Sequence, residues 1–348
     1  MVDILFATNR PQIGGDPLAP FGSGTVAAGG ALFCGVATVQ GIDPNAPSAG
    51  TIANIDKLVQ GNFGPQHLEP ILASTNDVLI FVHGAANSFT DAITRAAYNQ
   101  TWLAASGLPN STFDVIAFTW PATPYHFANI LGDLEDYKQD QRMATASAAQ
   151  FSDFLNQMAA LRSEMSQLGR RRMSLLCHSM GNFMLGGALQ AVLQGKDFDA
   201  PIFDEVILAA ADEPATTFNT PNQRLAGLAQ VGSEITVYYN NDDILMRLSH
   251  IANGGVHRLG YDGPANKPDT ELFPPSVYEF VDCTGVNDFL NSPLALDRSH
   301  QYYRQSQRVR TDIVQTLAGF APARPKFDPI ENVYTLFPER LHAPDRSA

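Results

Sequence analysis

Basic residues are scarce in this sequence: 22 Lys and Arg stand against 35 Asp and Glu, which gives a formal net charge of −13 at pH 7. Proteins that bind nucleic acids concentrate Lys and Arg to neutralise phosphates. We therefore expect no nucleic-acid partner. The rest of the composition, with 45% hydrophobic and 16% charged residues, is typical of a chain that folds around a globular core.

Cysteine is also rare. Cys34, Cys177 and Cys283 form no C-x-x-C pair, which argues against a disulfide framework or a zinc site. The eight histidines contain no H-E-x-x-H motif or other close pair of ligands. These absences predict a protein that needs no metal and no cofactor.

Long hydrophobic runs are missing as well. No apolar stretch approaches the ~20 residues that span a bilayer, so we expect no transmembrane segment. The N-terminal "MVDILFATNRPQ" lacks the basic residues and long apolar stretch of a secretory signal. We therefore expect a cytoplasmic location, and the sequence leaves the oligomeric state open.

Short apolar runs do occur, and they alternate with helical patterns from about residue 77 to 320. They are apolar at nearly every position, as in strands covered on both faces. The runs are "DVLIFVHG" (77–84), "FDVIAFTW" (113–120), "RMSLLCHS" (172–179), "DEVILAAAD" (204–212), "EITVYYN" (234–240) and "SVYEFVDCTG" (276–285). Between them, residues 151–168 carry an apolar stripe at helical spacing that ends at Gly169. This alternation predicts an α/β fold with a doubly wound, mostly parallel sheet and helices on both faces.

The length admits two domains, but we expect a single α/β domain over residues 1–348. Near the N-terminus, "DILFAT" and "ALFCGVATV" are candidate strands of the same sheet, and we expect an antiparallel pair there. Residues 320–348 are rich in proline from Pro322 onward. We expect this tail to be an extended arm over the surface.

A serine lies between a strand and a helix in "SLLCHSMGNFM" (174–184). A nucleophile on a sharp strand-to-helix turn needs small residues two positions before and after it. Gly181 meets this need, and Cys177 meets it approximately. The alternative is that Ser179 caps the following helix through its hydroxyl.

A second turn favours the catalytic interpretation. In "FVHGAANSF" an apolar run ends at His83 and Gly84, where serine hydrolases commonly place an oxyanion-hole amide. The amides of Ala85 and Met180 are candidates for binding the oxyanion of a tetrahedral intermediate. The alternative is an ordinary turn.

Serine needs a histidine base, and the histidine needs an acid, in the chain order Ser, Asp or Glu, His. The histidines after Ser179 are His250, His257, His300 and His342. We favour His300 because it follows the last predicted strand and precedes a helical pattern, so that it can reach the carboxyl ends of the strands.

Three carboxylates compete for the role of the acid. Asp242 and Asp243 lie just past the end of the predicted strand "EITVYYN", and Asp212 follows the preceding strand. We rank Asp243 first, Asp242 second and Asp212 third, each against the alternative of a solvated loop residue.

The motifs together resemble a bacterial α/β-hydrolase family, DUF900, over roughly residues 1–320. The resemblance rests on "ATNR", "FVHGAANSF", "FTWPA", "CHSMGNFML", "VILAAAD", "ITVYYNNDD" with "SHIANGGVHRLG", and "SHQYY". It implies an α/β-hydrolase fold with loop insertions near the site. It also implies Ser179 as nucleophile, His300 as base and Asp243 as acid, with Asp242 as the alternative.

The resemblance further suggests Ala85 and Met180 for the oxyanion hole, although many members of the family carry a bulkier residue where Ala85 stands. The insertion 262–276 and the segment 287–298 before His300 are long enough to cover the site, either as lids or as plain surface loops. Several aromatic residues are candidates for an acyl pocket, although each is more typical of a core. They are Phe81, Phe89, Trp120, Tyr125, Phe127 and Phe183.

We therefore expect a serine hydrolase that cleaves small-molecule carboxylic esters through an acyl-enzyme. An acyltransferase or a peptidase with the same triad is an alternative, since the fold does not determine the acceptor. A second alternative is a non-catalytic scaffold that serves as a binding module.

Overall fold

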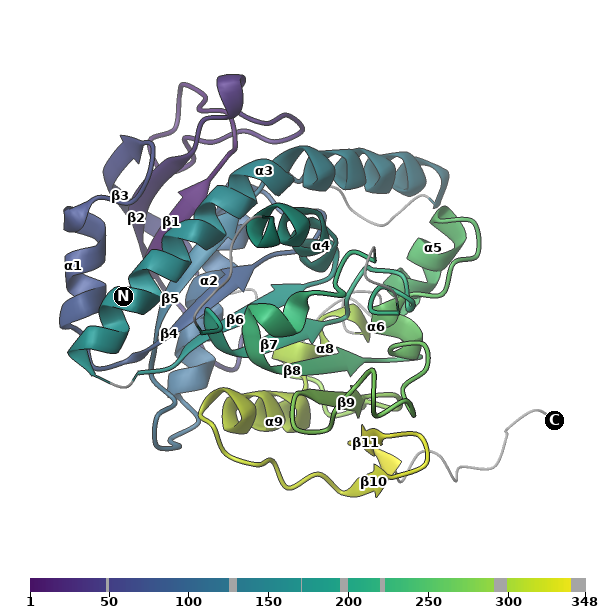
Figure 1. Ribbon diagram of the computed structural model, residues 1–348. Helices are drawn as coiled ribbons and strands as arrows, with labels where there is room; N and C mark the ends of the chain where they lie inside the picture. The colour runs from purple at the N-terminus through teal and green to yellow at the C-terminus, as the bar shows by residue number, and fades with distance from the viewer. Residues whose placement is uncertain are drawn as a thin grey trace.

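The computed structural model describes residues 1–47, 50–124, 130–169, 171–194, 200–219, 223–290 and 299–338. An 11-stranded sheet runs through the molecule in the order β10-β11-β9-β8-β7-β6-β4-β5-β1-β2-β3 (Figure 1). The strands are β1 (Val2–Thr8), β2 (Phe33–Gln40), β3 (Thr51–Gln60), β4 (Asp77–Val82), β5 (Phe113–Thr119), β6 (Met173–His178), β7 (Phe203–Ala209), β8 (Gly232–Tyr239), β9 (Tyr278–Asp282), β10 (Lys326–Asp328) and β11 (Val333–Thr335).

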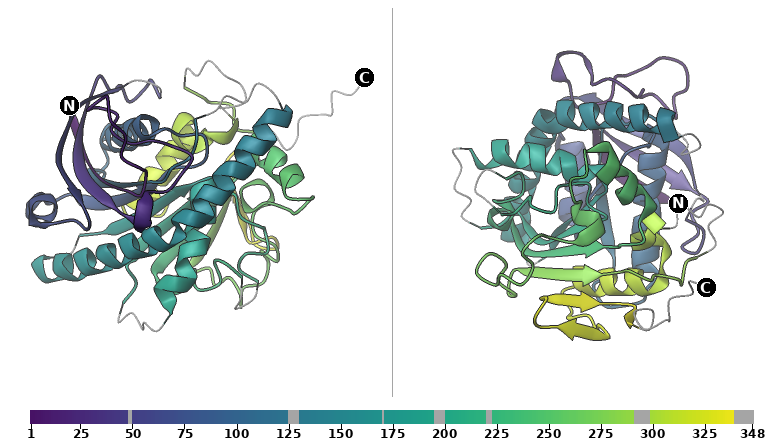
Figure 2. Two further views of the ribbon diagram at one scale, coloured as in Figure 1. Left: turned by 90° about the horizontal axis from the view of Figure 1, so that it is seen from above. Right: turned by 90° about the vertical axis from the view of Figure 1, so that its right-hand side faces the viewer.

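Helices cover both faces of this sheet (Figures 1 and 2). The core on one face includes residues of α1, α3 and α4, and the core on the other face includes residues of α2, α8 and α9. The helices are α1 (Pro65–Ala73), α2 (Phe89–Ala104), α3 (Ile130–Leu168), α4 (Met180–Leu193), α5 (Ile244–Ala252), α6 (Leu259–Asp262), α8 (Tyr302–Gln305) and α9 (Gln307–Leu317). The predicted fold class, a mostly parallel sheet between two layers of helices, is confirmed.

The central strands are parallel, and the sheet turns antiparallel at both margins. From β11 to β1 every neighbouring pair is parallel, whereas β1–β2, β2–β3 and β10–β11 are antiparallel. All residues of β6 are buried, which explains why apolar residues predominate in its sequence. The expected antiparallel pairing near the N-terminus is thus the pairing of β1 with β2.

The sheet has a topological switch point at β4, which lies between β5 and β6. Connections from neighbouring strands leave in opposite directions at such a point and open a crevice at the carboxyl ends of the strands. Strand β4 ends directly before His83, and β6 ends directly before Ser179. The two turns that the sequence singled out therefore meet at this crevice.

One helix is longer than the sequence predicted, and one strand was not predicted. The predicted helix over 151–168 is the second half of α3, which begins at Ile130. Strand β3 was not predicted, because it is an edge strand in which most side chains are half-buried or exposed and no clear alternation of hydrophobicity results.

The C-terminal tail is more ordered than the extended arm that was expected. Residues of β10 and β11 form a hairpin, and β11 extends the sheet by pairing in parallel with β9. Arg324 anchors this hairpin through Asp312 of α9 (Nε–Oδ2, 3.0 Å) and Glu279 of β9 (Nη1–Oε2, 2.6 Å). The prediction of a surface arm was therefore wrong for the hairpin, and residues 339–348 lie outside the described part.

We predict that Arg324→Ala destabilises the protein by about 3–5 kcal/mol, because it leaves the buried Asp312 carboxylate without its cation. Chemical denaturation followed by circular dichroism measures this change. The matched control is Arg142→Ala, which breaks an exposed pair with Glu135 and should cost less than about 1 kcal/mol. Equal losses in the two variants would contradict the anchoring role of Arg324.

Candidate active site

Ser179 lies on a strained turn between β6 and α4. Its backbone has φ 55° and ψ −125°, a region that residues with a Cβ rarely occupy and that costs about 1–3 kcal/mol. The Ser179 amide donates to Ala209 O (2.9 Å), and its carbonyl accepts from the amides of Asn182 (3.0 Å) and Asp212 (3.1 Å). Its hydroxyl makes no capping hydrogen bond to α4, so the helix-cap alternative fails.

The turn requires glycine at two places because backbones approach closely there. A Cβ on Gly181 would lie 2.7 Å from the carbonyl oxygen of His83, and a Cβ on Gly84 would lie 2.7 Å from Ser179 Cβ. The His83–Gly84 turn therefore lies directly against the serine. Position 177 accommodates a cysteine, and its buried side chain belongs to the core.

His300 and Asp243 meet in a buried contact. His300 Nδ1 lies 2.8 Å from Asp243 Oδ2, and both side chains are almost fully buried. The other carboxylate oxygen of Asp243 accepts from the amides of Leu245 (3.0 Å) and Met246 (3.1 Å), so Asp243 is also the N-cap of α5. The carboxylate therefore has a fixed orientation toward the imidazole.

The two other candidate acids have different partners. Asp242 is exposed and accepts from the amide of Gly285 (2.9 Å). Asp212 is buried and pairs with Arg258 (Oδ1–Nη2, 2.6 Å), while Tyr137 and Ser249 donate to it (2.8 and 2.5 Å). Ser249, part of the family resemblance, thus belongs to this second network.

His178 is a residue of the site that the sequence interpretation missed. Its Nε2 donates to the backbone carbonyl of His300 (3.2 Å), and the two rings lie with their centroids 4.7 Å apart. Burial lowers the pKa of His178 well below its ordinary value, with the neighbouring His300 adding to this effect, so His178 is neutral. This contact brings His300 beside the serine turn.

Two further side chains that were missed hold the histidine segment. Asn240 donates from Nδ2 to the carbonyl of Ser299 (3.1 Å). The Tyr302 hydroxyl donates to the carbonyl of Tyr238 (2.8 Å) and accepts from the amide of Ala210 (3.1 Å). The segment that carries His300 is thereby attached to the ends of β7 and β8.

Met180 directly follows Ser179 in the chain, and Ala85 directly follows Gly84, whose backbone lies against Ser179. Met180 begins α4, whose first amides have no partner within the helix. Within the described part of the chain, neither the amide of Ala85 nor that of Met180 donates a hydrogen bond. Two such groups next to a serine can stabilise a developing oxyanion.

His83 holds the turn that precedes Ala85. The amide of Trp120 donates to His83 Nε2 (3.1 Å), so Nδ1 carries the proton and donates to Gly84 O (2.7 Å). The Trp120 indole donates to the carbonyl of His83 (2.9 Å) and stacks on its ring. Burial lowers the pKa of His83 well below its ordinary value, which keeps the imidazole neutral in this role.

The other histidines lie elsewhere. His250 and His257 contact each other with ring centroids 5.3 Å apart, and His257 pairs with Asp262 at an exposed position (2.6 Å). His342 lies outside the described residues. His300 is thus the candidate that lies against both an aspartate and the serine turn.

The aromatic candidates for an acyl pocket divide into core and surface residues. Phe81, Phe89 and Trp120 are buried in the two cores. Phe183 is half-buried, with the Arg224 guanidinium 4.0 Å from its ring centroid. The remaining candidates, Tyr125 and Phe127, lie outside the described part of the chain.

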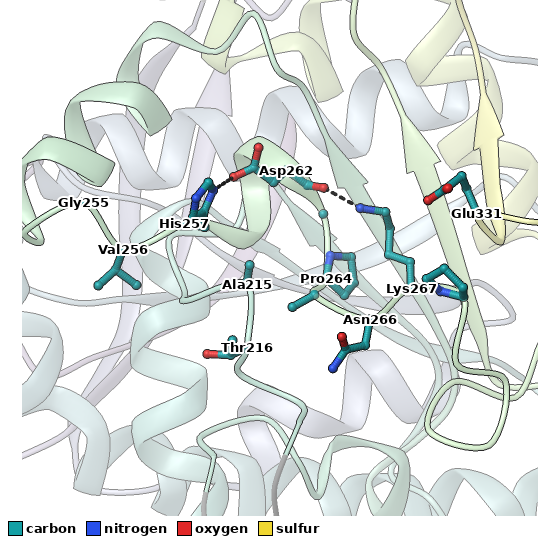
Figure 3. Close-up of a pocket in the computed structure, with 13 residues that line it drawn as sticks. Ala215, Thr216, Gly255, Val256, His257, Asp262, Pro264, Asn266, Lys267 and Glu331 are labelled. Carbon is teal, nitrogen blue, oxygen red and sulfur yellow. Dashed lines mark hydrogen bonds and ion pairs between the residues drawn. The ribbon is translucent and has the colours of Figure 1, made fainter.

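A cavity of about 450 Å³ lies beside α5 and α6, and its lining includes part of the insertion 262–276 but neither Ser179 nor His300. Figure 3 shows His257 directed at the Asp262 side chain and the Lys267 ammonium at a backbone oxygen of Asp262. The insertion is tied to the core through the buried Phe273. Most of the second proposed lid, 291–298, lies outside the described residues.

Among the described residues, no group of three or more His, Cys, Asp or Glu side chains has an arrangement that could hold a metal ion. No described helix combines the length and apolar character needed to cross a bilayer.

A family model described as "Alpha/beta hydrolase of unknown function (DUF900)" matches residues 66–317. The matched range includes Ser179, Asp243 and His300, and it begins after the "ATNR" segment at the end of β1. None of the curated proteins matches the chain at a significant level.

Several solved structures show a distant likeness. They include a cold-adapted esterase from an Arctic intertidal metagenomic library, with 11% identity, a TM-score of 0.35 and coverage of 82% of this chain and 93% of the esterase. Phospholipase PlaB from Legionella pneumophila in complex with thio-NAD has 10% identity, a TM-score of 0.33 and coverage of 70% and 62%. A puromycin-hydrolysing peptidase of Mycobacterium tuberculosis has 12% identity, a TM-score of 0.33 and coverage of 87% and 39%. The chain spans less than two thirds of the phospholipase and of the peptidase, and likenesses this low carry no argument about its activity.

We predict that Gly181→Ala destabilises the protein by about 1–3 kcal/mol, because the new Cβ would press on the carbonyl oxygens of Val82 and His83. Thermal unfolding measures this loss. Gly14→Ala is the control, since a Cβ there would have no heavy atom within 4 Å. Unchanged stability of both variants would show that the turn tolerates a side chain at position 181.

Proposed function

Because this chain belongs to the DUF900 family of α/β-hydrolases, we propose that it is a serine hydrolase that cleaves carboxylic esters through an acyl-enzyme. Ser179 is the nucleophile, His300 the general base and Asp243 the acid that orients the base. The observation that carries the proposal is the 2.8 Å contact of His300 with Asp243, which lies beside the strained Ser179 turn. No cofactor takes part, and the substrate is a small-molecule ester.

In the first half of the reaction, His300 Nε2 takes the proton from Ser179 Oγ as the oxygen attacks the ester carbonyl carbon. Asp243 fixes the tautomer by accepting from Nδ1, so that Nε2 is the basic nitrogen. The protonated imidazole then gives its proton to the departing alcohol, and the acyl group remains on Ser179.

In the second half, His300 takes a proton from water as the water attacks the acyl carbon. The imidazole returns this proton to Ser179 Oγ when the acid leaves. In both halves the amides of Ala85 and Met180 donate to the oxyanion, and their stabilisation is greatest in the transition state.

An acyltransferase or a peptidase would use the same three side chains with an acceptor alcohol or an amide bond. Comparing alcoholysis with hydrolysis, and amides with esters of the same acyl group, separates these reactions from ester hydrolysis. The backbone of Ser179 at φ 55° costs free energy, and a protein without catalytic activity would gain nothing from this conformation. The strained serine therefore argues against a non-catalytic scaffold.

We predict that the purified protein hydrolyses p-nitrophenyl esters and that Ser179→Ala lowers kcat at least about 10⁴-fold. A fluorophosphonate probe should label the parent and not the variant. The matched control is Ser174→Ala, which removes a buried hydroxyl from β6, the strand that ends before Ser179, and should retain full activity. Equal rates in Ser179→Ala and the parent would reject the nucleophile, whereas folded but inactive and unlabelled parent protein would favour the scaffold.

We further predict that Asp243→Asn lowers kcat/KM by about 10³–10⁴-fold, because an amide cannot stabilise the imidazolium or hold its tautomer. Asp242→Asn, the same change at the neighbouring exposed residue, should leave kcat/KM within about twofold of the parent value. The reverse result, a large loss in Asp242→Asn and none in Asp243→Asn, would assign the acid to Asp242.

A further inference from the structure

Two motifs of the family resemblance have no place in the triad: "ATNR" at the end of β1 and "FTWPA" at the end of β5. Both lie near the loop after β4 that carries Ala85. Arg10 of the first stretch is fully buried and donates to Thr119 Oγ1 (2.8 Å) and to the carbonyl of Asn87 (2.7 Å). Arg10 therefore joins the ends of β1 and β5 to the Ala85 loop.

Asp140 of α3 approaches the same loop and is also fully buried. Its Oδ2 accepts from the amide of Ala86 and its Oδ1 from the amide of Thr123, each at 2.8 Å. The two charged side chains thus bridge the same pair of segments, 84–87 and 119–123. Arg10 does so through carbonyl and hydroxyl oxygens, and Asp140 through amides.

The orientation of the loop peptides follows from these bonds. The carbonyl oxygen of Gly84 accepts from His83 Nδ1 (2.7 Å) and from Asn87 Nδ2 (3.1 Å). Because a trans peptide is planar, the amide of Ala85 in the same peptide must point the opposite way. Asp140 fixes the next peptide by binding the amide of Ala86, whose φ of 58° is unfavourable for a residue with a Cβ.

Both groups carry charge at the pH of an esterase assay. Burial raises the pKa of Asp140 to about 6, against the lowering effect of the Ala86 and Thr123 amides and of Arg10. Burial lowers the pKa of Arg10 to about 9. At pH 7.5 Asp140 is therefore ionised and accepts both amides, and Arg10 is cationic.

Buried ions are an inefficient way to stabilise a fold, since apolar replacements of similar volume are often at least as stable. Here Asp140 accepts from the amide of Ala86, and Arg10, which also donates to Gly22 and Ser23, donates to the carbonyl of Asn87. Both ions therefore hold the loop whose Gly84 lies against Ser179. From this arrangement we infer that Arg10 and Asp140 are positioning residues that hold the amide of Ala85 in the orientation required to bind the oxyanion. The inference rests on the proposed function, because it assigns these side chains to the oxyanion hole of that site.

The test compares Asp140→Asn with the parent at pH 7.5. The amide side chain keeps the shape of Asp140 but has one acceptor oxygen, so it can bind the amide of Ala86 or of Thr123 and not both. We expect kcat for a p-nitrophenyl ester to fall about 10- to 100-fold while KM changes less than about twofold, since the oxyanion forms only after binding. The inhibition constant of a trifluoromethyl ketone, whose adduct with the serine carries an oxyanion, should rise by the same factor as kcat falls.

Asp153→Asn is the matched control, because Asp153 is exposed on the same helix, and it should leave both quantities unchanged. Arg10→Lys is the second variant, which keeps the charge but loses the planar fork of donors. It should reproduce the kcat loss and serves in place of Asp140→Asn if that variant does not fold. A lowered melting temperature with parental kcat and inhibition constant in either folded variant would overturn the inference and leave only a structural role.

Labelling of the parent by a fluorophosphonate distinguishes a failure of the positioning role from a failure of the proposed function. A labelled, active parent with unaffected Asp140 and Arg10 variants would overturn the positioning role alone. An unlabelled and inactive parent would overturn the proposed function, and the positioning inference would fall with it.

Discussion

The structure around the switch point of the sheet depends on one constraint: Ser179 occupies a backbone conformation that a residue with a Cβ avoids. Such strain persists only where the surroundings leave no relaxed alternative. The surroundings here are the hydrogen bond from the Ser179 amide to β7, the close approach of Gly181 to the carbonyl of His83, and the α4 helix that begins immediately afterwards. Strand β6 anchors the turn from the other side, since every residue of that strand is buried.

Asp243 links local structure to the site in a second way. One carboxylate oxygen caps α5 through two backbone amides, and the other accepts from the imidazole of His300. The hydrogen bonds that begin α5 therefore also orient the carboxylate toward the imidazole. The neighbouring Asp242 lacks this arrangement because its carboxylate faces an exposed glycine amide.

Much of this could be predicted from the sequence, because strands buried on both faces have uninterrupted apolar sequences and the turns between them have small residues. Ser179, His300 and Asp243 could be selected by chain order and by their positions after strands. The edge strand β3, the first half of α3 and the C-terminal hairpin lack such a pattern. The contact of Asp140 with Ala86 was beyond prediction for another reason: nothing in a helical pattern indicates which backbone amide a buried carboxylate will meet in the folded chain.

The antiparallel margins of the sheet also affect how the molecule behaves among copies of itself. An open sheet ends in two rows of backbone groups, and a long flat edge can recruit a strand from another chain. Here β10 has three residues, and β3 is paired with register shifts and carries mostly exposed or half-buried side chains. A three-residue strand at one side and a strand with register shifts at the other give incoming strands little regular backbone to pair with, which disfavours edge-to-edge aggregation.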